Sequence, residues 1–165
     1  MPLLKAGRIV DDPWRHLDDA EAAPEHEAAT VSFKRWSSEH EALSRRNGPL
    51  GIRLANDVAP TSLARRDIER FELITLSFPR FTDGRGYSQA RILRTQLGYR
   101  GELRATGDVL RDQLLFMRRC GIDAFDVGER ALVEDWTAAL ADFDLFYQPA
   151  EDNRPWIGRQ RLATR

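Results

Sequence analysis

The sequence contains very little cysteine and histidine. Its 165 residues include one cysteine, Cys120, and three histidines, His16, His26 and His40. A single cysteine excludes an internal disulfide framework, a CxxC redox pair and an iron–sulfur cluster held by the cysteines of one chain. The histidines lie in the N-terminal quarter without metal-ligand spacing, so we expect no metal site and no Ser–His or Cys–His dyad. A redox group would have to come from a partner, or from a cofactor bound without a recognised motif.

Long apolar runs and an excess of one charge are also missing. No run approaches the roughly 18 apolar residues of a membrane span, and the N-terminus does not read as a signal peptide. The net charge is -1, from 25 basic and 26 acidic side chains. This balance gives no electrostatic footprint for nucleic acid or an anionic membrane. We therefore expect a cytoplasmic protein that binds neither. Only two of the basic residues, Lys5 and Lys34, are lysines, and arginine suits an anionic ligand.

The length fits one domain, which we place at residues 1–150, followed by a polar C-terminal tail at 151–165. Residues 1–49 read as short strands, an acidic loop and a first helix. Within them, the alternation in Val31–Trp36 predicts a half-buried strand. Ser38 with Glu41 three residues later predicts a capping box for a helix over 39–46.

From residue 50 onward the pattern is a strand followed by a helix, repeated four times. The expected strands are Leu50–Leu54, Leu73–Phe78, Leu103–Thr106 and Ala124–Val127, and the last helix covers about 129–141. The fold class is therefore α/β with parallel strands. Periodicity leaves open whether the four units form half of a (β/α)8 barrel or a small open sheet. A half-barrel would expose sheet edges, which predicts either a homodimer or cover by the N-terminal strands.

Each expected strand-to-helix loop carries an acid: Asp57, Asp83, Asp108 and Glu129. Acids that converge at the carboxyl edge of a parallel sheet could hold a metal ion or act as general acid and base. Asp83 and Asp108 are our candidates for catalysis. The alternative is structural, since an acid just before a helix satisfies free N–H groups and complements the helix dipole.

The segment Gly84-Arg85-Gly86 precedes an expected helix. Its backbone amides could approach an anion, with Arg80 and Arg85 adding charge-assisted hydrogen bonds. The spacing is not G-x-G-x-x-G, because Gln89 stands at the third position, so no dinucleotide cofactor is indicated. We expect Arg80 and Arg85 to face one pocket with Asp83 and Asp108. The alternative is a tight turn that needs glycine dihedral angles.

Two further residues are candidates. Cys120 falls at an expected helix C-terminus, where a buried structural thiol is favoured over a reactive one. Trp156, with arginines around it in the tail, is a candidate for docking a partner protein, and an unstructured terminus is the alternative.

The amino-acid sequence of the central region resembles that of a known bacterial family. The segments that show this resemblance are Phe-Pro-Arg-Phe-Thr-Asp-Gly-Arg-Gly-Tyr-Ser (78–88), Gly-Tyr-Arg-Gly-Glu-Leu-Arg-Ala-Thr-Gly-Asp-Val (98–109) and Arg-Cys-Gly-Ile-Asp-Ala-Phe-Asp (119–126). With the opening Ile-Val-Asp-Asp-Pro-Trp (9–14), they resemble the family catalogued as domain of unknown function 934. Its members are often labelled probable oxidoreductases of sulfite reduction, through association with sulfite reductase. The family supplies no catalytic residues.

Two functions follow as expectations. The resemblance implies an accessory protein of assimilatory sulfite reduction that acts with sulfite reductase and helps to supply its electrons. The competing class is a small α/β enzyme or anion-binding protein that uses the edge formed by Arg80, Asp83, Arg85 and Asp108. The sequence leaves open whether the chain catalyses a reaction.

Overall fold

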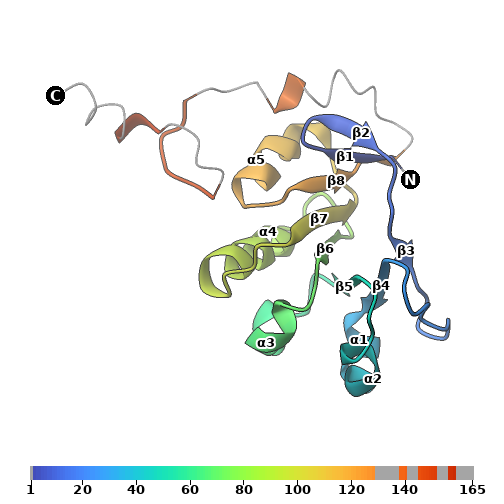
Figure 1. The fold of residues 1–165 in the computed structure, drawn as a ribbon. Helices are drawn as coiled ribbons and strands as arrows, with labels where there is room; N and C mark the ends of the chain where they lie inside the picture. Colours follow the sequence, from blue (N-terminus) through green and yellow to red (C-terminus); the bar gives the residue numbers. More distant parts are fainter. Residues whose placement is uncertain (1, 129–137, 141–144, 152–155, 159–165) are drawn as a thin grey trace.

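Strands and helices alternate along the chain in the computed structural model, which describes residues 2–128, 138–140, 145–151 and 156–158 (Figure 1). The strands are β1 (Leu3–Lys5), β2 (Arg8–Val10), β3 (Arg15–His16), β4 (Ala29–Ser32), β5 (Leu50–Leu54), β6 (Leu73–Phe78), β7 (Glu102–Gly107) and β8 (Ala124–Asp126). The helices are α1 (Phe33–Ser38), α2 (His40–Ser44), α3 (Arg65–Ile68), α4 (Arg85–Arg91) and α5 (Leu114–Arg119). Short turns of other helix types are η1 (Pro60–Ser62), the π-helical η2 (Ile92–Gln96) and η3 (Arg111–Gln113).

All strands belong to one sheet, in the order β2-β1-β8-β7-β6-β5-β4-β3. From β3 to β8 every neighbouring pair is parallel, and strands that follow one another in the chain are neighbours in space. The predicted class is confirmed: the chain is an α/β protein with successive parallel strand–helix units in an open, curled half-barrel sheet. The N-terminal strands are short, as expected.

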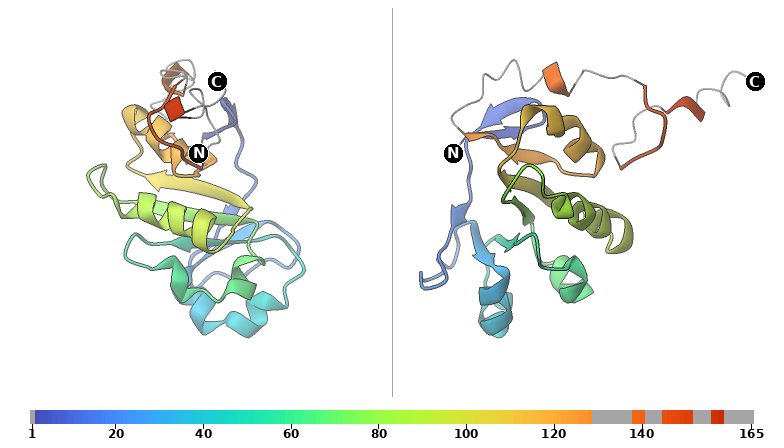
Figure 2. Two further views of the ribbon diagram at one scale, coloured as in Figure 1. Left: turned by 90° about the vertical axis from the view of Figure 1, so that its left-hand side faces the viewer. Right: turned by 180° about the vertical axis from the view of Figure 1, so that it is seen from behind.

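The sheet has to curl, because a short link joins its two edges. Strands β2 and β3 lie at opposite ends of the sheet, yet only Asp11–Trp14, which we call the strap, separates them in the chain. Eight strands about 4.8 Å apart span roughly 34 Å when flat, whereas the chain from Val10 to Arg15 reaches about 18 Å at most. The strap therefore acts as a chord across the open side of the curled sheet, where Figures 1 and 2 show it.

The N-terminal strands also answer the question of the exposed edges. Strand β1 pairs antiparallel with β8, β2 pairs with β1, and β3 extends the other edge by pairing with β4. The strands at the two edges of the complete sheet, β2 and β3, have three and two residues. Short edge strands give little backbone for another chain to pair with. Cover by the N-terminal strands, one of the two expected solutions, is thus present.

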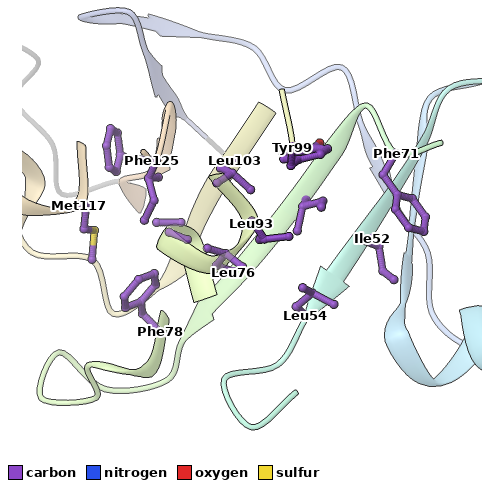
Figure 3. Packing of buried hydrophobic residues seen from close by; sticks show 14 of the residues in the cluster. Ile52, Leu54, Phe71, Leu76, Phe78, Leu93, Tyr99, Leu103, Met117 and Phe125 are labelled. Carbon is purple, nitrogen blue, oxygen red and sulfur yellow. The ribbon is translucent and has the colours of Figure 1, made fainter. Parts of the chain in front are cut away.

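The apolar core lies between the convex face of the sheet and the helices (Figure 3). Ile74, Leu76 and Phe78 alternate along β6 toward this side, and Leu93 and Met117 come from the helical layer. All five side chains are buried. Burial of this kind stabilises a domain by about 25 cal/mol per Å² of apolar surface removed from water.

One expected element of the N-terminal region is different. The half-buried strand predicted over Val31–Trp36 stops at Ser32, where α1 begins. The Ser32 side chain accepts a hydrogen bond from the Arg35 amide at 3.0 Å, so it is the N-cap, whereas the Ser38 hydroxyl donates to the Arg35 carbonyl. Val31 and Phe33, two residues apart, fit a strand, whereas Phe33 and Trp36, three residues apart, share one face of a helix, and the cap decides between the two.

The C-terminal region is described in part. The helix expected over about 129–141 lies mainly outside the described residues, as does Glu129. Within the expected tail, Trp156 forms an isolated parallel bridge with Phe146, and the Ile157 amide donates to the Phe146 carbonyl at 2.8 Å. None of the helices in the described part of the chain is long and apolar enough to cross a membrane.

Candidate functional site

The loop between β6 and α4 holds the first group of predicted site residues. Asp83 and Arg85 form a bidentate ion pair, with Arg85 Nη2 2.6 Å from Asp83 Oδ2 and Nε 3.0 Å from Oδ1. The Asn56 amide donates to the same carboxylate from the end of β5, at 2.5 Å. The carboxyl ends of β5 and β6 thus meet here, as the parallel topology requires.

The contacts of Asp83 have an electrostatic consequence. Hydrogen bonds from the Arg85 side chain and backbone hold the pKa of Asp83 far below its ordinary value, and the same pair raises the pKa of Arg85. A carboxylate this acidic is a poor general base at neutral pH. The Arg85 amide also donates to Asp83 Oδ1 at 3.2 Å, so Asp83 satisfies a free N–H at the start of α4.

The structural alternative for the acids of this edge is a helix cap, and Asp108 is not one. Its carboxylate accepts a hydrogen bond from the Phe81 amide at 3.0 Å, across from the neighbouring loop. The helical turn that follows, η3, starts only at Arg111. Asp108 therefore fixes the conformation of the loop after β6, and it lies at the same sheet edge as Asp83.

Of the two glycines in the candidate anion loop, Gly86 is required by packing and Gly84 is not. Gly84 has a φ of -79°, which any residue adopts, and Gly86 has no positive φ either. A Cβ atom on Gly86 would lie 2.5 Å from the Phe78 ring, so glycine here lets α4 approach β6. The tight-turn alternative is therefore wrong for these two glycines. Arg80 is exposed on the loop, and its carbonyl accepts a hydrogen bond from the Asp83 amide at 2.9 Å.

The acids of the sheet edge do not assemble a metal site in the described part of the chain. Asp57 is exposed, and no three His, Cys, Asp or Glu side chains there lie close enough together to hold a metal ion. Whether Arg80, Asp83, Arg85 and Asp108 bind an anion stays a prediction.

The remaining candidates are placed as follows. Cys120 is buried beneath the end of α5, and burial raises the pKa of its thiol, which argues against a nucleophile. Trp156 is half-buried against the segment around Phe146. His26 is exposed, and His40 is half-buried against the Trp36 ring with its Nε2 3.2 Å from Asp67 Oδ2. His16 is part of a polar network on the other face of the sheet.

The concave face of the sheet holds a polar group that the sequence reasoning missed. Its central residues Arg53, Thr75 and Arg104 are direct neighbours on β5, β6 and β7. The register continues this row to Ser32 on one side and to Ala124 and Lys5 on the other. Because strand residues alternate between faces, these side chains point away from the apolar core.

Arg104 anchors the strap to this face. Its side chain is buried, with 2% exposed, and donates from Nη1 to Asp12 Oδ2 at 2.6 Å. Nε and Nη2 donate to Glu102 Oε1 at 3.0 and 2.8 Å. Lys5 Nζ lies 2.6 Å from the other oxygen of Glu102. The charge of Arg104 is thus offset by two carboxylates, which a buried guanidinium requires.

The network continues from the strap to the other side of the sheet. Asp12 Oδ2 lies 2.8 Å from His16 Nε2, and His16 Nδ1 lies 2.8 Å from the Thr30 hydroxyl. Arg53 donates to that hydroxyl at 2.8 Å, to the Thr30 carbonyl at 2.9 Å and to the Leu17 carbonyl at 2.5 Å. A chain of polar contacts therefore joins β7, the strap, β3, β4 and β5.

Between the strap and the concave face lies a cavity of about 340 Å³, which we call the inner chamber. Its lining includes Trp14, His16, Arg53, Thr75, Arg104 and Asp126. The Thr75 side chain is buried, and its hydroxyl has no hydrogen-bond partner in the described protein.

A sequence signal for this chamber exists. Buried parallel strands usually read as near-continuous apolar runs, but three successive strands here carry polar residues at every second position. The polar residues are Arg53 in β5, Thr75 and Ser77 in β6, and Glu102, Arg104 and Thr106 in β7. Alternation in phase across neighbouring strands indicates a polar inner face.

The comparison with known proteins gives a family without a mechanism. The family model described as "bacterial protein of unknown function (DUF934)" matches residues 51–157, and no curated protein matches the chain. The matched range starts at β5 and so contains the sheet edge, Thr75, Arg104 and the exposed loops, while the strap precedes it. With most of its length covered, the chain belongs to this family of bacterial proteins of unknown function, DUF934.

Proposed function

We propose that the protein is a cytoplasmic accessory protein of assimilatory sulfite reduction that docks on sulfite reductase and helps to supply its electrons. The association of the family with that enzyme supports the proposal. The observation in the structure that carries the docking part is a group of exposed aromatic side chains around α5.

This aromatic surface consists of Phe81, Phe116 and Tyr147. Their exposed fractions are 50%, 58% and 80%. Phe116 contacts the Tyr87 ring at a centroid distance of 4.8 Å, and Gln113, one turn before it, donates to the Phe81 carbonyl at 2.8 Å. Tyr147 belongs to a segment held against α5 by Arg119, whose Nη2 donates to the Gln148 carbonyl at 2.6 Å.

Exposed aromatic side chains of this kind suit a protein partner. Single exposed apolar residues are common on surfaces, but aromatic side chains are enriched in interfaces and dominate their binding energy. Arg119 lies over the Phe146 ring at 3.9 Å, which adds a positive group beside the aromatic surface. A partner that buries these rings would gain apolar contact at the centre and polar contact at the rim.

The role in the pathway is tested by growth. A clean deletion strain should grow on sulfide or cysteine as sole sulfur source but not on sulfate or sulfite. Sulfite reductase activity should be lost from its extracts and restored by the purified protein. Normal growth on all four sources would separate the protein from sulfite reduction.

The docking surface is tested by substitution. Tyr147→Ser and Phe116→Ser should each reduce co-purification of sulfite reductase about tenfold or more, because interface aromatic residues commonly contribute 1–2 kcal/mol or above. Val10→Ser is the matched control, since Val10 is an exposed apolar residue on β2, outside the aromatic surface. Equal co-purification by wild type, Tyr147→Ser and Phe116→Ser would rule out this surface.

The second candidate, an enzyme or anion-binding protein at the loop edge, is favoured by the exposed Arg80 beside the Asp83–Arg85 pair. In that case the isolated protein binds a small anion, and Arg80→Ala, Arg85→Ala or Asp83→Ala abolishes binding. Unchanged binding in these variants would remove the loop edge from consideration.

A further inference from the structure

We propose that the inner chamber binds a small molecule through one carboxylate or oxyanion group, held by Arg53 and Thr75. The site is separate from both the aromatic surface and the loop edge, and the inference does not depend on the proposed function. Three features of the chamber carry it: an unpartnered hydroxyl, an arginine without a direct salt bridge in the described protein, and a suitable volume.

The Thr75 hydroxyl needs a partner from inside the chamber. The side chain is 3% exposed and belongs to the chamber lining, and its oxygen has no hydrogen-bond partner in the described protein. A buried polar group without a partner is costly, and native proteins rarely keep one. Valine has nearly the same shape and would avoid that cost. The presence of a threonine here therefore indicates that its hydroxyl has a partner, supplied by a group that occupies the chamber.

Arg53 supplies the charge beside this hydroxyl. It lies directly opposite Thr75 in the pairing of β5 with β6. Its hydrogen bonds go to two backbone carbonyls and the Thr30 hydroxyl, and it forms no salt bridge with any residue that the structure describes. Arginine stays protonated at all physiological pH values. The carboxylates of Asp18 and Asp19 act on Arg53 only from beyond salt-bridge distance, so the chamber holds a positive charge that no direct ion pair neutralises.

The other charged groups of the chamber do not cancel this preference. Arg104 is compensated by Asp12 and Glu102. Asp126 lies on β8, two strands away from Thr75, which places the two backbones about 10 Å apart at the usual strand spacing. An anion beside Thr75 and Arg53 therefore meets a guanidinium and a hydroxyl donor before it meets a free carboxylate.

The volume limits the ligand to a small one. At about 340 Å³ the chamber is at the lower end of small-molecule sites and has room for roughly eleven waters. Trp14 and Leu3 add apolar wall beside the polar floor. The chamber thus suits a compact organic acid or an oxyanion such as sulfate or phosphate.

The test is titration of the full-length protein with sulfate, phosphate, acetate and succinate. Binding is measured by calorimetry and by the shift in the midpoint of thermal unfolding. At least one probe should bind and raise the midpoint, since a ligand that binds only the native state stabilises it. Thr75→Val should weaken that probe about tenfold or more, the usual effect of losing a hydrogen bond to a charged group. Binding of the first two probes alone would identify an oxyanion site, and of the last two alone a carboxylate site.

The control is Thr61→Val, the same substitution at an exposed position of η1. It should leave binding unchanged. Thr75→Val should fold as well as wild type because its hydroxyl makes no hydrogen bond within the described protein. The proposal is overturned if none of the four probes binds, or if Thr75→Val binds as tightly as wild type. Neither result bears on docking to sulfite reductase, which the aromatic surface variants test.

Discussion

Two glycines in adjacent loops show how one residue can be replaceable and another not. Gly107 ends β7 with a φ of +100°, and a Cβ atom there would overlap the Phe78 carbonyl oxygen. That carbonyl accepts the Asp108 amide at 2.7 Å, so it has no room to move. Gly84 has an ordinary φ of -79°, and its Cβ would lie 3.9 Å from the nearest atom, in the Tyr87 ring.

Gly107→Ala should therefore reduce the free energy of unfolding by about 2–3 kcal/mol, from the left-handed φ and the backbone overlap together. Gly84→Ala should leave it unchanged or raise it by about 0.5 kcal/mol, since alanine restricts the unfolded chain. Urea unfolding of both variants measures the difference. Equal stability of the two would mean that the end of β7 differs from the arrangement described here.

At the scale of elements, α1 begins where a strand was expected to continue. The Ser32 hydroxyl caps the helix through the Arg35 amide and donates to Asp19 Oδ1 at 2.6 Å. The helix that Ser38 was predicted to cap, over 39–46, is present as α2 (His40–Ser44), but its N-cap residue is Glu39. Ser38 lies instead at the C-terminal end of α1 and donates to the Arg35 carbonyl at 3.1 Å. The two serines therefore have opposite places in the same short helix.

Removing the cap should be the more damaging change. Ser32→Ala should cost about 1 kcal/mol or more, because it leaves an amide of the first turn without its acceptor. Ser38→Ala should cost less than about 0.5 kcal/mol, as for most exposed positions. Chemical denaturation of the two variants gives the comparison, and a larger loss for Ser38→Ala would support Ser38 as the cap of the helix over 39–46.

At the scale of the whole molecule, the strap holds the two edges of the sheet together. Asp12 is its main contact, through Arg104 on β7 and His16 on β3. Burial raises the pKa of Asp12, but the hydrogen bonds from Arg104 and His16 lower it more, so the net pKa is below its ordinary value. An aspartate with a lowered folded-state pKa stabilises the protein above its unfolded pKa of about 3.9.

Asp12→Asn should accordingly lower stability at pH 7 by about 1–3 kcal/mol, between the values for exposed and buried ion pairs. The difference from wild type should shrink as the pH falls below about 4, through the lowered pKa of Asp12. Unfolding at pH 7 and pH 2.5 measures both quantities. Asp11→Asn is the control, because Asp11 is the exposed neighbour in the same strap and should have little effect. A difference that persists at pH 2.5 would argue against the Asp12 carboxylate as its source.

The homodimer that an uncovered half-barrel predicts remains a prediction at this scale. The N-terminal strands extend both edges of the parallel sheet, which removes one reason for a second copy. Light scattering of the purified protein decides the oligomeric state.

Much of the fold follows from local pattern. The apolar run of β6, the glycines after the helices and the repeated strand–helix order are enough to predict parallel units from residue 50 onward, because each depends on neighbours in the chain. The contact between Asp83 and Asn56 could also be predicted, since the carboxyl ends of parallel strands lie at one edge of the sheet. The end of the expected strand at Ser32 was not predictable, because Phe33 fits the strand period with Val31 and the helical period with Trp36.

The sequence by itself therefore determined the class of fold and the repeated parallel strand–helix units from residue 50 onward, and its segments resemble the family that the comparison shows. Only the tertiary structure decided that the sheet curls, that the strap crosses its open side, and that Arg53, Thr75, Arg104 and Asp12 meet there. The physical reason is separation along the chain: Asp12 and Arg104 are 92 residues apart. No local periodicity encodes their contact, which arises when a short link has to join two distant edges of one sheet.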